Sequence, residues 1–98
     1  MSYLERARLV AKPERRALAV LLLSDLVDEL HELAALHPGR RSAAVTAIAQ
    51  HLSAAQDLLD PPADVGTLMS AIEHEPGAAR AIAAELAALV AAQDVHGR

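Results

Sequence analysis

Three short breaks rich in proline and glycine divide the chain into four segments, each long enough to form a helix. The breaks lie at residues 37–40, 60–64 and 75–77. Proline lacks the amide hydrogen that a continuing helix needs, and glycine readily adopts the turn conformations that follow a helix. We therefore expect the chain to fold as helices joined by tight turns.

The segments between the breaks repeat their apolar residues with the period of an α-helix. The expected main helices span about 13–36, 41–59, 64–74 and 76–93. A shorter helix over about 3–11 is expected because residues 2–5 read Ser-Tyr-Leu-Glu, the pattern of a capping box. Asp64 is in place to cap the third of the main helices.

The apolar residues are mostly of two kinds, 23 alanines and 16 leucines, and Tyr3 is the only aromatic residue. Sheet proteins prefer β-branched and aromatic side chains, and disordered chains lack this much apolar surface. The composition therefore predicts an all-α protein without strands, and 98 residues correspond to one domain, 1–98. Because the break at 37–40 is short, the helices on either side are expected to be antiparallel. We expect a small antiparallel helical bundle of four main helices with a short additional N-terminal helix.

The start of the first main helix is apolar on every side. From residue 24 onwards its leucines form one heptad-like stripe, but over 17–23 large aliphatic residues point in all directions. Because neighbouring helices would cover the stripe first, we expect Leu18, Leu21 and Leu22 to form a homodimer interface.

Two questions about this interface stay open. Alanines recur every four residues over 83–92 of the last helix, which either allows close helix packing or reflects only the high helix propensity of alanine. The short N-terminal helix, through Leu4, Leu9 and Val10, would remove the interface if it folded back over Leu21 within the same chain.

The charge and the apolar runs bear on partners and location. Nine basic and thirteen acidic residues give a net charge of −4 with histidine neutral, so that nucleic-acid binding is disfavoured. The apolar run of seven residues over 17–23, which no other apolar run exceeds, is too short for a membrane span. The chain has no cysteine and no recognisable secretory signal, and we expect a cytoplasmic protein.

An acidic cluster lies on the first main helix, where residues 26–33 read Leu-Val-Asp-Glu-Leu-His-Glu-Leu. This stretch resembles the first acidic motif of the all-α nucleotide pyrophosphohydrolases of the MazG type. The resemblance implies a hydrolase that binds magnesium through Asp28, Glu29 and Glu32, with a second carboxylate pair on the next helix. In an antiparallel helix pair that second position falls at about residues 46 and 49, which are threonine and alanine.

Glu29 has a second expected partner in His51. Both residues fall at the edge of the apolar stripe of their helix, and antiparallel packing puts them within about one turn of each other. We expect either a partly buried Glu29–His51 pair that satisfies both polar groups, or two side chains that reach solvent separately at the rim. Both arrangements are structural rather than catalytic.

No other group of residues predicts catalysis. The five serines lack the glycine turn that surrounds a nucleophile, and the chain has no glycine-rich phosphate loop. The sequence is thus most typical of a non-catalytic helical interaction module without a cofactor: a small regulatory, adaptor or assembly protein that acts as a homodimer or with another protein. The alternative is the magnesium-dependent hydrolase that the acidic cluster implies.

Overall fold

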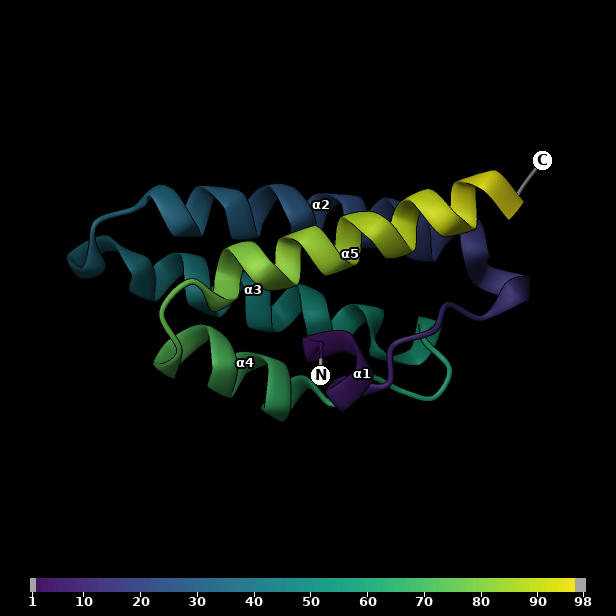
Figure 1. Cartoon of the computed structure of the whole chain (residues 1–98), viewed down its shortest axis with the longest axis horizontal. Helices are drawn as coiled ribbons and strands as arrows, with labels where there is room; N and C mark the ends of the chain where they lie inside the picture. Colours follow the sequence, from purple (N-terminus) through teal and green to yellow (C-terminus); the bar gives the residue numbers. More distant parts are fainter. Residues whose placement is uncertain (1, 97–98) are drawn as a thin grey trace.

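The structure is a computed structural model that describes residues 2–96, and its regular elements are helices (Figure 1). The α-helices are α1 (Tyr3–Ala7), α2 (Arg16–Ala35), α3 (Arg41–Ala55), α4 (Val65–His74) and α5 (Ala78–His96). Three short 3₁₀ helices accompany them, η1 (Pro13–Arg15), η2 (Pro38–Arg40) and η3 (Gln56–Leu58). The described residues contain no strand, only an isolated bridge between Ala11 and Leu59. The expected all-α class is confirmed.

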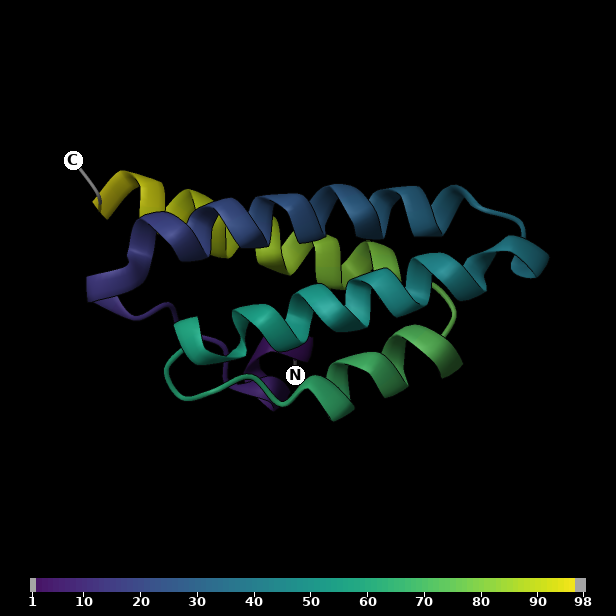
Figure 2. The same cartoon turned by 180° about the vertical axis from the view of Figure 1, so that it is seen from behind.

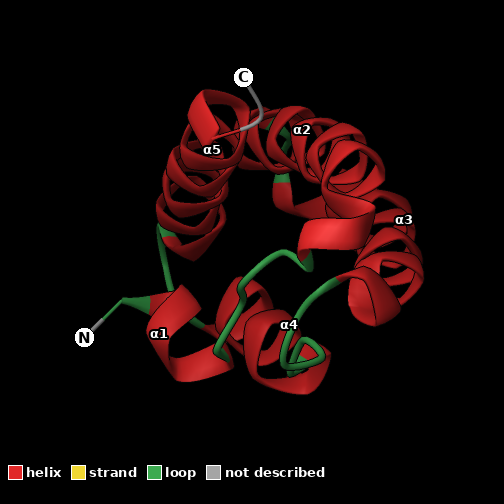
Figure 3. Cartoon of the chain, turned by 90° about the vertical axis from the view of Figure 1, so that its right-hand side faces the viewer, coloured by secondary structure: helices red, strands yellow, loops and turns green. Residues whose placement is uncertain are grey.

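The four longer helices run in alternating directions along the long axis of the molecule, as Figures 1 and 2 show from opposite sides. α2 lies between α3 and α5, and its contact with α5 is the most extensive in the molecule. α4 lies beside α3, and α1 occupies the position between α4 and α5, so that five helices surround one core (Figure 3). Within residues 2–96, no helix is long and apolar enough to cross a membrane.

The core is built from one stripe of α2 and the inward faces of the other helices. The stripe consists of four leucines that solvent does not reach, Leu23, Leu26, Leu30 and Leu33. The other large side chains at the centre are Ile48, Leu52, Leu59, Leu68, Ile82 and Leu86. No polar or charged residue is buried in the part of the chain that the structure describes. The leucine stripe expected on the first main helix therefore faces inward.

The main helices lie where the breaks place them, and the differences are confined to their ends. The expected helix over 13–36 starts as the 3₁₀ turn η1, and the expected helix over 41–59 finishes as the 3₁₀ turn η3. Such tightening at helix ends satisfies backbone groups that have no partner further along the helix.

α1 is shorter than the sequence predicts. Ser2 forms the expected capping box: its Oγ accepts a hydrogen bond from the Glu5 amide (3.0 Å), and its amide donates to the Glu5 carboxylate (3.4 Å). Arg8, however, adopts a left-handed conformation (φ 55°) and ends the helix at Ala7 instead of near residue 11.

The residues after α1 leave the helix because they pair with the end of η3. The Lys12 amide donates a hydrogen bond to the Leu58 carbonyl (3.1 Å), and the Asp60 amide donates one to the Val10 carbonyl. These long-range hydrogen bonds satisfy backbone groups that would otherwise need helical partners. The expectation of a helix to residue 11 was therefore wrong, because a tertiary contact replaces the local one.

Asp64 caps α4 as expected. Its Oδ2 accepts a hydrogen bond from the Thr67 hydroxyl (2.5 Å), and its Oδ1 accepts one from the Thr67 amide (3.1 Å). Both hydrogen bonds favour the charged carboxylate, and they lower the pKa of Asp64, the hydroxyl more than the amide.

Replacing Asp64 with alanine is expected to lower the melting temperature by a few degrees, because α4 loses its cap. The pKa of Asp64 is lower in the folded than in the unfolded protein. The stabilisation that the charged cap provides is therefore fully present above the pKa that Asp64 has in the unfolded chain. It is lost as the pH falls through the folded pKa. Circular dichroism melts of the wild type and Asp64→Ala should therefore converge on acidification.

The control for this measurement is Asp64→Asn, which retains a capping oxygen but has no carboxyl group to titrate. The difference between its melting temperature and that of Asp64→Ala should stay constant with pH. If the difference in melting temperature between the wild type and Asp64→Ala were also independent of pH, this would contradict a charged cap.

Candidate interaction surface

Two of the three leucines expected at an interface lie on the outer face of α2. Leu18 exposes 52% of its surface and Leu21 exposes 64%. Ala17 beside them is also exposed, whereas Leu22 is half-buried and packs against the core. The structure thus brings Leu18 and Leu21 together on the surface and turns Leu22 inward. We call the exposed residues Ala17, Leu18 and Leu21 the α2 patch.

α1 does not cover the α2 patch. It packs against α4 and α5 on another side of the molecule (Figure 3). Leu4 contacts the core, Leu9 is buried, and Val10 is exposed, so none of these apolar residues is used to shield Leu21. The alternative in which the N-terminal helix folds back over Leu21 is therefore wrong.

The alanine rows of α5 lie mostly on its outer surface. Ala83 is fully buried, but the alanines further along are exposed: Ala84, Ala87, Ala88, Ala91 and Ala92. Ala87 and Val90 border a shallow hollow of about 220 Å³ whose other side is formed by Ser24, Val27 and Asp28 of α2. Because α5 is antiparallel to α2, its last turns lie at the same end of the molecule as the first turns of α2 (Figure 1).

The acidic cluster of α2 does not converge on one point. Asp28 borders the hollow on the α5 side, Glu29 contacts α3 on the opposite side, and Glu32 is exposed to solvent. Across residues 2–96, no group of three or more histidine, aspartate or glutamate side chains is close enough to hold a metal ion. The structure therefore does not bring Asp28, Glu29 and Glu32 together as ligands of one magnesium ion.

Glu29 and His51 are in direct contact and link α2 to α3. The Oε1 atom of Glu29 lies 2.5 Å from Nδ1 of His51. The two side chains expose 23% and 49% of their surface, respectively, so that the pair lies at the rim of the helix contact. Of the two expected arrangements, the structure shows the paired one, with Glu29 partly buried and His51 exposed at the rim.

A double-mutant cycle on Glu29→Gln and His51→Gln measures the strength of this contact. Because both side chains are accessible to solvent, we expect a coupling free energy of about 0.2–1 kcal/mol in urea denaturation. Pairing Glu32→Gln with His51→Gln is the matched control, since Glu32 is exposed one turn further along α2. A coupling above about 2 kcal/mol would contradict a rim position.

α1 is held by two glutamates that the sequence pattern did not indicate. The Glu85 carboxylate accepts hydrogen bonds from the amides of Tyr3 (2.9 Å) and Leu4 (3.1 Å), and Glu75 accepts one from the Tyr3 hydroxyl (3.2 Å). Partial burial, followed by the nearby charge of Glu75, raises the pKa of Tyr3. These partners are 72 to 82 positions apart, and no local pattern could have identified them.

Comparison with known proteins finds no relative of this chain. No protein-family model matches it, and no curated protein or solved structure matches it either. The resemblance to the pyrophosphohydrolases therefore remains limited to residues 26–33.

Proposed function

We propose that the protein is a non-catalytic helical interaction module, a small regulatory, adaptor or assembly protein that forms a homodimer through the α2 patch. The observation that carries the proposal is the exposure of Leu18 and Leu21, which leave 52% and 64% of their surface to solvent. Adjacent exposed leucines on one helix face are a common feature of protein interfaces. A cytoplasmic location is a further part of the proposal and rests on the absence of cysteine.

A second copy of the chain is the simplest partner for this patch. In a dimer with twofold symmetry the same surface of each copy faces the other, so that Leu18 and Leu21 of both copies are buried. Leu18 and Leu21 are three positions apart and form a short ridge that fits the groove of a second α2 helix. The exposed alanines of α5 have small side chains and leave room for that helix to approach.

The size of the patch implies a weak dimer. Burying the exposed halves of four leucines contributes about 3–6 kcal/mol, if a whole leucine contributes roughly 1.5–3 kcal/mol. Association itself costs about 4 kcal/mol or more. The leucines alone therefore fall short of the roughly 4–8 kcal/mol that a millimolar to micromolar dissociation constant requires. A dimer at micromolar concentration needs the alanine surface of α5 to supply most of the contact.

Replacing Leu21 with glutamate is expected to abolish the dimer without unfolding the subunit. The new carboxylate would lie at the centre of the interface, where burial of a charge is unfavourable. In multi-angle light scattering at about 100 μM, the wild type should have the mass of a dimer and Leu21→Glu that of a monomer. Circular dichroism should show the same helix content in both.

Leu36→Glu is the matched control, since Leu36 is also partly exposed (37%) but lies beyond the opposite end of α2. This variant should remain a dimer. A wild type that is monomeric at high micromolar concentration would refute the homodimer, and so would a dimer that Leu36→Glu dissociates while Leu21→Glu does not.

A further inference from the structure

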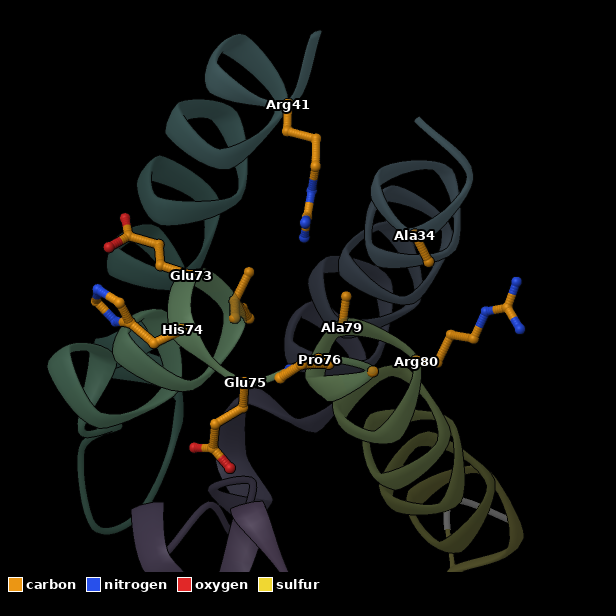
Figure 4. A pocket seen from close by; sticks show the side chains of 10 residues that line it. Ala34, Arg41, Glu73, His74, Glu75, Pro76, Ala79 and Arg80 are labelled. Atoms are coloured by element: carbon orange, nitrogen blue, oxygen red, sulfur yellow. The ribbon is translucent and has the colours of Figure 1, made fainter. Parts of the chain in front are cut away.

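A hollow of about 420 Å³ opens where α4 turns into α5 (Figure 4). Four helices contribute to it, and Ala34 of α2, Ile72 of α4 and Ala79 of α5 form its apolar part. Arg41, the first residue of α3, extends its guanidinium group into the space between these helices (Figure 4). The volume is within the range of small-molecule sites, about 300–1,000 Å³.

Arg41 has no acidic partner in this hollow. Its Nε atom is shielded from solvent and makes no hydrogen bond with any described residue. The lining contains two acidic residues, but neither is directed at Arg41. The Glu73 carboxylate points away from it (Figure 4), and Glu75 accepts a hydrogen bond from the Tyr3 hydroxyl.

The geometry points to a binding site for a small organic carboxylate, held by the guanidinium group of Arg41, with its apolar body against Ile72 and Ala79. A guanidinium group presents its N–H donors in a planar fork that matches the two oxygens of a carboxylate. Because Nε itself is shielded, a carboxylate in the hollow would accept its hydrogen bonds from the terminal nitrogens of the guanidinium group. The site is separate from the α2 patch and does not depend on the homodimer.

The charges around the hollow favour a singly charged ligand over phosphate. Arg80 also lines the hollow, but its side chain points away from the centre (Figure 4). Arg41 is thus the one positively charged side chain that Figure 4 shows directed inward. Glu73 and Glu75 at the edge would repel the second negative charge of a phosphate dianion.

Titration of the ¹⁵N-labelled protein with isovalerate tests this site directly. The Nε–Hε signal of Arg41 should shift with saturation at millimolar concentration. Acetate should bind several-fold more weakly, because it lacks the apolar body that Ile72 and Ala79 would contact. A shift that does not saturate, or inorganic phosphate that binds more tightly than isovalerate, would overturn the proposal.

Two arginine variants separate a specific contact from a general effect of positive charge. Arg41→Gln should weaken isovalerate binding about tenfold or more, followed through the backbone amide signals of residues 72–79. Arg80→Gln removes the same charge from the same lining but from a side chain that points outward, and it should change binding less than about twofold. Equal losses in both variants would contradict the assignment to Arg41.

The melting temperature without ligand gives a second, independent test. Arg41→Met should raise it by about 2–6 °C, because it removes a shielded donor that has no partner and keeps an unbranched apolar stem that ends near the position of Nε. Excess isovalerate should then stabilise the wild type but not Arg41→Met. A lower melting temperature for both Arg41→Met and Glu73→Gln would show that Arg41 pairs with Glu73 in solution, and would refute the site.

Discussion

The burial of one leucine stripe on α2 is the interaction on which the rest of the structure depends. The four leucines over 23–33 are inaccessible to solvent, and α2 contacts α3 on one side and α5 on the other. The chain has neither phenylalanine nor tryptophan, and its many alanines bury little area each. Leucine therefore supplies most of the apolar area in the core, and the contact between α2 and α5 is correspondingly extensive.

The same arrangement determines which surface remains apolar. A helix in a single ring around a core can bury only its inward side, so that the outer face of α2 meets solvent along its length (Figure 3). Asp25, Asp28 and Glu32 make this face polar in its second half, but Ala17, Leu18 and Leu21 occupy it near the start. The core does not require leucine at positions 18 and 21, and this supports the homodimer contact that we propose for them.

Polar side chains in this protein mostly stabilise helix ends and helix edges. Asp64 caps α4, Glu85 caps α1 from a distant helix, and Glu29 contacts His51 across the edge between α2 and α3. Each of these groups has a partner at hydrogen-bonding distance. Arg41 differs, because its Nε is shielded by the protein and yet unpaired within the described residues. This donor belongs to a residue that lines the hollow at the turn between α4 and α5.

The sequence by itself determined the helices and their inward faces. Proline, glycine and capping residues act on the nearest turn of backbone, and helical periodicity selects one face, so breaks, caps and the leucine stripe are local properties. Antiparallel register also brought Glu29 close to His51, although it did not establish how far the pair is buried. Only the tertiary structure decided that α1 ends at Ala7, that Glu85 caps it and that Arg41 enters a hollow. Each of these features brings together residues that are tens of positions apart in the sequence. Whether such a contact is favourable depends on which surfaces the packed helices leave open.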